Sequence, residues 1–264
     1  MSSSADLSLF AARLSERAFL SDDDRETLVA LPHVRRRINA NTYILREGEP
    51  PPSTCALLIS GMTFRHKLTV QGARQIVAIQ LPGELLDLQH LFLNVADHSV
   101  QALTETEVAD IDRDILQNLI LNRPSIARAF WVDGLIDASI FREWVLNVGR
   151  RDAKAKIAHI LCELAVRLRG AGLIAESESF VLPMTQEQLG DATGLTSVHV
   201  NRTIKALAAE GLIEHGGRYL SIANWRALRR VGDFNPLYLH LDQVSARFAS
   251  PLDDLFTSPR PMEG

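Results

Sequence analysis

The sequence has few cysteines and no long apolar run. Only two cysteines, Cys55 and Cys162, occur among 264 residues, and two such distant thiols form no disulfide framework. No stretch of about 18 apolar residues is present, so no membrane-spanning helix is expected. The first residues, MSSSADLSLF, lack the basic start and apolar core of a signal peptide. These absences predict a cytoplasmic protein without a membrane partner.

Motifs of catalysis are missing as well. The sequence contains no phosphate-binding loop, no GxSxG elbow and no HExxH pair. His159 and Cys162 lie three residues apart in a helical pattern, a spacing that could supply two metal ligands. The apolar neighbours of Cys162 favour a buried structural cysteine instead. We therefore expect no enzyme and no metal site.

An excess of basic residues, common in nucleic-acid-binding proteins, is absent overall because the net charge is -4. The charge is unevenly distributed along the chain. Lys+Arg minus Asp+Glu is -5 over residues 1–141, +4 over 142–232 and -3 over 233–264. A basic balance confined to one section suits contact with phosphates at that section.

Residues 30–112 consist of short β-rich runs separated by glycine, proline and polar turns. Strands of this length and spacing are typical of a small barrel or sandwich. Gln71-Gly72 lies between FRHKLTV and RQIVAIQL and predicts a hairpin turn. Helices are expected on either side of this block, over residues 6–18 and 113–122.

From Pro124 to about residue 148 the pattern becomes one long helix. Its apolar residues form two stripes. One stripe contains Ile126, Phe130, Ile136, Ile140 and Trp144, and the other contains Trp131, Leu135, Ala138 and Val145. A helix with two apolar faces needs two surfaces to cover them. We expect a homodimer through residues 124–148; a fully buried helix within a monomer is the alternative.

Two short helices are expected further on, at about residues 186–193 and 197–210. Thr185 and Gln188 form a capping box at the start of the first helix. Gly194 in the connecting turn permits the left-handed backbone that a tight helix–helix connection requires. Two β-rich runs around Gly216-Gly217 follow. Helix, turn, helix and hairpin together predict a winged helix-turn-helix.

The second of these helices has a polar and basic face. Its exposed residues would contact base edges in a major groove, and Arg202 is suited to bidentate contact with guanine. The expected base-reading residues are Ser197, Val198, His199 and Arg202. The expected phosphate contacts, which position without specifying sequence, are Thr185, Thr196, Asn201, Lys205 and Arg218. An ordinary surface helix or a protein-interaction module is the alternative.

The segment MTQEQLGDATGLTSVHVNRTIKALAAEGLI resembles the DNA-binding element of the CRP/FNR superfamily of bacterial transcription regulators. CALLISGMTFRH and LPGELLDL resemble the superfamily's β-roll signatures, with Gly61, Gly83 and Glu84 at the familiar places. The similarity covers about residues 10–230. Many members carry Arg or Glu where this chain has Ser197 and Val198, so a different target half-site is expected.

The resemblance implies an α+β chain: a jelly-roll-like β-roll over residues 10–123, a dimerisation helix over 124–149 and a winged helix-turn-helix over 150–232. An acidic tail with four prolines follows over 233–264. The resemblance also implies a homodimer on a roughly palindromic site in double-stranded DNA, with RNA polymerase as a further partner. By the same resemblance, a ligand pocket is expected at Gly83, Glu84, Leu85 and Ser99. A ligand-binding or protein-interaction scaffold that has lost DNA binding is the alternative function.

The signal that controls the protein is constrained by what is missing. Cyclic-nucleotide-binding members carry an arginine after the GEL-type turn, but residues 75–112 contain no Lys or Arg, which disfavours cyclic AMP because a buried phosphate needs a cation. Glu84 is then expected to be satisfied by backbone donors. Two cysteines cannot supply the four thiolates of an iron–sulfur cluster. Haem needs only one axial histidine, such as His90 or His98, but ordinary hydrogen-bonded histidines are the commoner explanation.

Overall fold

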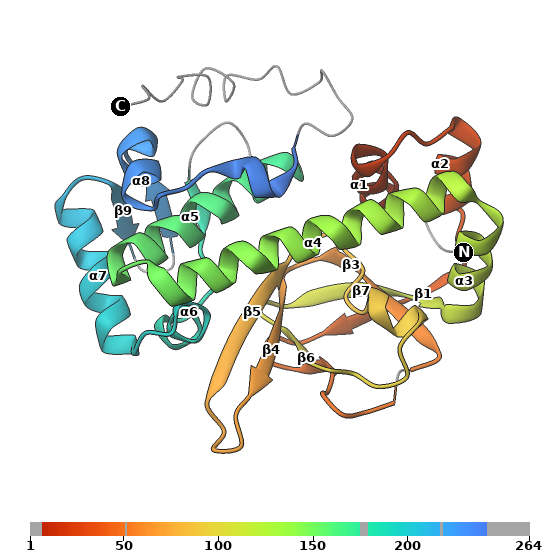
Figure 1. Ribbon diagram of the computed structural model, residues 1–264, viewed down its shortest axis with the longest axis horizontal. Coiled ribbons are helices and arrows are strands. Elements are labelled where there is room, and N and C mark those ends of the chain that lie inside the picture. The colour runs from red at the N-terminus through yellow and green to blue at the C-terminus, as the bar shows by residue number, and fades with distance from the viewer. Residues whose placement is uncertain (1–6, 51, 175–178, 217–218, 242–264) are drawn as a thin grey trace, which may run out of the picture.

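The computed structural model describes residues 7–50, 52–174, 179–216 and 219–241. An N-terminal β-roll and a C-terminal helical unit lie at opposite ends of one long helix, α4 (Pro124–Arg150), which crosses the whole molecule (Figure 1). The described residues form three antiparallel sheets, two in the N-terminal unit and one in the C-terminal unit. This arrangement confirms the predicted α+β fold class.

The β-roll is built from two antiparallel sheets with strand orders β1-β7-β3 and β2-β6-β4-β5. Leu58, Val100 and Val108 from both sheets are at most 1% exposed and belong to the apolar core of the roll. The strands are β1 (His33–Ile38), β2 (Tyr43–Leu45), β3 (Thr54–Ser60), β4 (Thr63–Leu68), β5 (Arg74–Gln80), β6 (Ser99–Ala102) and β7 (Thr106–Asp112). The predicted hairpin is confirmed, since β4 pairs with β5 around Gly72.

Helices precede and follow the strands of the β-roll along the chain. α1 (Ser8–Arg17) and α3 (Arg113–Asn122) confirm the two predicted helices, and the short 3-10 helix η1 (Leu88–Leu91) lies between β5 and β6. The sequence analysis missed α2 (Asp22–Val29). Ser21 and Asp24 form a capping box at its start, which stabilises a helix that has few apolar residues of its own.

The two apolar stripes predicted for α4 differ in burial. The first stripe packs inward, and its five residues Ile126, Phe130, Ile136, Ile140 and Trp144 are between 0% and 7% exposed. The second stripe faces solvent: Trp131 is 73%, Leu135 55% and Val145 58% exposed, and Ala138 is also exposed. Helix α4 therefore covers its own chain with one face and leaves the other face uncovered.

The C-terminal unit contains α5 (Ala153–Gly170), α6 (Gln186–Thr193), α7 (Ser197–Ala209), α8 (Trp225–Val231) and the 3-10 helix η2 (Pro236–Leu239). Its sheet has the order β8-β10-β9, with bounds Ser179–Val181, Tyr219–Ile222 and Ile213–Gly216. Strands β9 and β10 pair antiparallel as predicted for a wing, while residues 217–218 at its turn lie outside the described residues. Within the described part of the chain, no helix is long and apolar enough to cross a membrane.

The two units are in direct contact. Phe64, Ile76 and Ile79 of the β-roll share one apolar cluster with Leu189 and Ala192 of α6. Helix α6 packs on β5, and η2 packs on α4. The C-terminal unit is therefore held against the β-roll as well as following it in sequence.

Candidate nucleic-acid interface

The turn between α6 and α7 depends on two glycines. Gly194 adopts a left-handed conformation with φ of 68° at the end of α6, a conformation that glycine adopts without strain. Gly190 allows close approach, because a Cβ atom at this position would lie 2.4 Å from the Leu195 carbonyl oxygen. The same pair of residues forms a backbone bond, in which the Leu195 N–H donates to the Gly190 carbonyl at 3.0 Å.

Both helices are capped as the sequence predicted. The Thr185 hydroxyl accepts from the Gln188 N–H at 3.1 Å, and the Gln188 side chain accepts from the Thr185 N–H at 2.9 Å. The Thr196 hydroxyl accepts from the His199 N–H at 3.3 Å and so caps α7. These caps satisfy N–H groups that would otherwise lack partners. The first turn of each helix is thereby stabilised.

Helix α7 has one buried face and one open face. Val200, Ile204 and Leu207 are at most 6% exposed and pack into the core. All four predicted base-reading residues are exposed, and we call them the reading face: Ser197, Val198, His199 and Arg202. Val198 is 75% exposed. The reading face is therefore open to solvent.

A shallow hollow lies between the starts of α6 and α7. It is lined by Gln186, Ser197, Val198, Asn201, Arg202 and Lys205. Among the described residues, neither Arg202 nor Lys205 has an ion-pair partner. The hollow therefore gathers hydrogen-bond donors and two free cations, which suits the phosphates and base edges of a nucleic acid.

The predicted phosphate contacts are placed as follows. Lys205 and Asn201 line the hollow, whereas the hydroxyls of Thr185 and Thr196 are engaged in capping at exposed positions. Arg218 lies outside the described residues. Gln186, which was not predicted as a contact residue, directly follows the capping residue of α6 and lines the hollow. Its position at the first residue of α6 was visible in the sequence and could have identified it.

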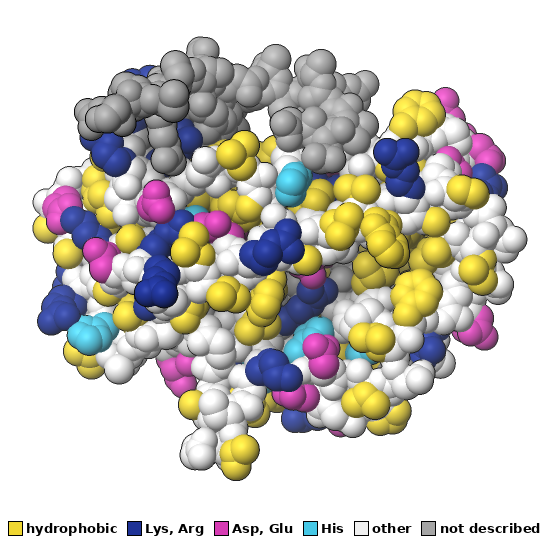
Figure 2. Space-filling view, viewed as in Figure 1, with side chains coloured by type: hydrophobic (Ala, Val, Ile, Leu, Met, Phe, Trp, Pro, Cys, Tyr) yellow, Lys and Arg dark blue, Asp and Glu magenta, His cyan; other side chains and the backbone are white. Residues whose placement is uncertain are grey.

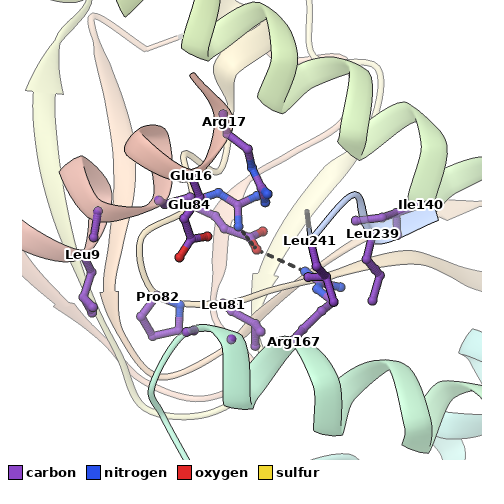
Figure 3. A pocket seen from close by; sticks show the side chains of 14 residues that line it. Leu9, Glu16, Arg17, Leu81, Pro82, Glu84, Ile140, Arg167, Leu239 and Leu241 are labelled. Carbon is purple, nitrogen blue, oxygen red and sulfur yellow. Dashed lines mark hydrogen bonds and ion pairs between the residues drawn. The ribbon is translucent and has the colours of Figure 1, made fainter. Parts of the chain in front are cut away.

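Glu84 has partners that the sequence analysis did not anticipate. We expected backbone donors, and this expectation is wrong. Arg13 of α1 and Arg167 of α5 each lie 3.1 Å from Glu84 Oε1. Figure 3 shows Glu84 and Arg167 directed toward each other in a cavity of about 120 Å³. The Glu84 carboxylate, in a turn of the β-roll, is thus neutralised by arginines from α1 and α5.

A larger cavity of about 640 Å³ lies between α4 and the segment that follows β5. Its charged lining residues are Arg13, Arg65, Glu84, Asp133 and Asp137. Residues 75–112 contain no Lys or Arg, but the cavity still contains cations, because Arg13 and Arg65 reach it from outside that segment. These two arginines nevertheless face three carboxylates. Burial opposes the charge of Asp137, but Arg65 lowers the pKa of Asp137 below its usual range, so both groups stay ionised and paired.

The residues predicted for a ligand pocket are only partly brought together. Glu84 and Leu85 both line the larger cavity. Gly83 is buried and follows β5 with φ of 88°. The Ser99 hydroxyl accepts from the Glu47 N–H at 3.0 Å and is absent from the lining of the described cavities. The larger cavity is therefore lined by the turn at Glu84 and by α4, and Ser99 of β6 does not line it.

The two thiols and His159 are buried. Burial raises the pKa of both Cys55 and Cys162 well above the usual range, which keeps the thiols protonated. Burial, followed by the charge of Arg151, lowers the pKa of His159 to about 4. Its two ring nitrogens lie 3.1 Å from the Gly232 carbonyl and 3.1 Å from the Tyr238 hydroxyl. Both nitrogens are therefore occupied, and no cluster of three metal-ligand side chains occurs among the described residues.

The two histidines considered for haem lie in the β-roll. His98 Nδ1 lies 2.7 Å from an Asp97 carboxylate oxygen. His90, in η1, is fully buried, and neither ring nitrogen has a hydrogen-bond partner among the described residues. Burial lowers the pKa of both imidazoles, so they are neutral near pH 7.

Comparison with known proteins adds two domain matches. Residues 155–231 match a family model described as a Crp-like helix-turn-helix domain. Residues 35–123 match a model described as a cyclic nucleotide-binding domain. The first range contains α6, α7 and α8, and the second range contains all strands of the β-roll except the first two residues of β1.

Relatives and solved structures extend over most of the chain. The nitrogen fixation regulation protein FixK of Bradyrhizobium diazoefficiens is 29% identical over 207 residues, which cover 76% of this chain and 84% of that protein. The transcriptional activator protein FnrL of Cereibacter sphaeroides is 26% identical over 227 residues, covering 83% and 90%. The structure of FixK2 from Bradyrhizobium japonicum matches with a TM-score of 0.69 and 25% identity, covering 76% of this chain and 98% of that one.

Proposed function

Because the chain belongs to the CRP/FNR family of transcription regulators, we propose that it acts as a homodimer on a roughly palindromic DNA site. The chain is a DNA-binding transcription regulator and not an enzyme. We further propose which residues contact the bases, which surface joins the two copies, and where the controlling signal acts. We propose that it acts in the cytoplasm, where the DNA of a bacterial cell lies.

The exposed reading face of α7 supports the base contacts most directly. A helix of 13 residues is capped by Thr196 and anchored by Val200 and Leu207, and such a helix can enter a major groove without refolding. Arg202 carries the guanidinium that fits guanine, and Lys205 one turn on supplies a phosphate contact.

Substitution of Arg202 tests this assignment. We expect Arg202→Ala to weaken binding to the preferred site by about 1–3 kcal/mol, or about 5- to 150-fold, and to relax sequence preference at one base pair. Arg37→Ala is the matched control, because Arg37 is an arginine of the β-roll with an 82% exposed side chain. Equal loss on all sequences would instead make Arg202 a phosphate contact, and unchanged affinity would refute its role.

The uncovered stripe of α4 supports the homodimer. Trp131, Leu135 and Val145 are more than half exposed, and Phe141 and Leu146 beside them are 50% and 44% exposed. Figure 2 shows hydrophobic side chains gathered along the middle of this face, where α4 crosses the molecule in Figure 1. Exposed apolar surface of this extent favours association, and a second copy of the same helix offers the complementary stripe.

A charged residue in this stripe should prevent dimerisation. We expect Trp131→Glu to convert the protein to a monomer by native mass measurement and to abolish high-affinity binding to a palindrome. Val70→Glu is the control, because Val70 is fully exposed at the tip of the β4–β5 hairpin, away from α4. A dimeric Trp131→Glu protein would place the interface elsewhere.

The signal acts at the β-roll and is neither cyclic AMP nor an iron–sulfur cluster under this proposal. The larger cavity carries two arginines against three carboxylates, which disfavours a phosphodiester. Two buried cysteines, one in each unit, do not provide four thiolates. The absorption spectrum and native mass of the purified protein test haem, iron–sulfur and bound metabolite together. RNA polymerase is the proposed partner at the promoter.

A further inference from the structure

Two ion pairs connect the β-roll to the C-terminal unit at separate places. At the first, Arg167 of α5 lies 3.1 Å from Glu84 and donates to the Ile79 carbonyl at 2.8 Å. At the second, Arg74 of β5 lies 2.7 Å from Asp191 of α6. Both pairs are shielded, with side chains between 10% and 24% exposed. We call these two pairs the interdomain ion pairs.

The second pair is reinforced by the backbone. Gln75 Nε2 donates to the Asp191 carbonyl oxygen at 2.7 Å, so both the side chain and the main chain of Asp191 are bound to β5. Ile76 of β5 and Leu189 of α6 also belong to one apolar cluster. Helix α6 is consequently fixed in position and rotation on the β-roll.

Fixing α6 also fixes α7. Leu189 of α6 and Val200 of α7 are buried in the same apolar cluster, and the turn approaches α6 closely at Gly190. The reading face stays exposed in this arrangement. The ion pairs therefore hold α7 in an orientation that is open to DNA.

We infer that Arg74, Asp191, Glu84 and Arg167 are positioning residues that set the spacing of the two recognition helices. This inference rests on the proposed homodimer. In a dimer joined through α4, the distance between the two α7 helices depends on how rigidly each C-terminal unit is attached to its β-roll. Helix-turn-helix dimers require half-sites about one helical turn apart, so a fixed attachment produces a fixed spacing requirement.

The inference assigns Glu84 a role different from ligand binding. Its carboxylate is bound by Arg13 and by Arg167, which belongs to the C-terminal unit. Removal of Glu84 would disturb two helices at once, because both arginines also pair with other carboxylates. Arg74 is the better test position, because its side chain is 24% exposed and has Asp191 as its ion-pair partner.

The experiment compares Arg74→Gln with the wild type on duplexes carrying one half-site, the preferred palindrome, or that palindrome with about one or two extra base pairs between half-sites. We expect unchanged affinity for one half-site, about 5-fold weaker binding to the palindrome, and a smaller penalty for altered spacing. In DNA-free protein, the amides of α6 should exchange hydrogen faster. The charge-swapped variant Arg74→Asp with Asp191→Arg should restore the spacing penalty.

Arg36→Gln is the control, because Arg36 forms an ion pair with Asp110 at 2.6 Å within the β-roll and does not connect the units. An Arg74→Gln protein with the wild-type spacing profile would overturn the inference, as would equal loss on the single half-site. Failure of the wild type to prefer any sequence would instead refute the proposed function.

Discussion

Gly190→Ala should damage the helix-turn-helix through a single methyl group. The added Cβ would lie 2.4 Å from the Leu195 carbonyl oxygen, with the Leu195 carbonyl carbon at 3.5 Å. Real Cβ atoms essentially never approach a heavy atom closer than 3.0 Å, so the turn must move by at least 0.6 Å. The obstructing atom belongs to the backbone and cannot rotate away. The bond from the Leu195 N–H to the Gly190 carbonyl must stretch or break as the turn moves.

The magnitude follows from two opposing effects. Alanine is favoured over glycine within a helix by roughly 0.5–1 kcal/mol. Overpacking against a rigid neighbour costs about 1–3 kcal/mol, and loss of the turn hydrogen bond costs about 1 kcal/mol more. We expect a net decrease of about 1–3 kcal/mol in the free energy of unfolding, together with weaker DNA binding because α7 shifts.

Urea unfolding and DNA titration measure the two effects. Gly170→Ala is the matched control, because Gly170 is a helical glycine at the end of α5, outside the dimerisation helix, with nothing within 4 Å of the added Cβ. We expect this control to be slightly stabilised and to bind DNA normally. Equal stabilisation of the Gly190→Ala protein, with normal DNA binding, would refute the close-approach reasoning.

Two further predictions concern pH and salt. The pKa of His159 is about 4 in the folded protein, against 6.5 in the unfolded protein. As the pH falls, the unfolded state therefore takes up the proton first. Between pH 7 and pH 5 this group should reduce the free energy of unfolding by about 2 kcal/mol. Urea unfolding of His159→Gln at both pH values should lack this loss, and an identical pH dependence would contradict it. Lys205→Ala should weaken binding uniformly across sequences and reduce the slope of log affinity against log salt by about 1 per protomer; an unchanged slope would show that Lys205 does not contact phosphate.

The local patterns of the C-terminal unit and α4 were predictable from the sequence. Capping by Thr185, the glycine at 194 and the buried spacing of Val200 and Leu207 involve residues within one or two helical turns of each other. Such patterns are set by backbone geometry and helical periodicity. The unequal burial of the two α4 stripes required the structure, because periodicity identifies faces without identifying what covers them.

Long-range partners were not predictable. Glu84 is bound by residues 71 positions before it and 83 positions after it, and no local pattern indicates such a pair. The absence of cations from residues 75–112 therefore led to the wrong expectation of backbone donors. The pairing of Arg74 with Asp191, 117 positions apart, was invisible for the same reason.

Selection from random double-stranded DNA at low salt tests the central claim most directly. A homodimer that presents the reading face of α7 should enrich a roughly palindromic sequence with half-site centres about 10 bp apart, and Arg202→Ala should lose preference at one position in each half-site. If the wild type enriches no sequence under these conditions, the chain is a scaffold without specific DNA binding and the proposed function is wrong.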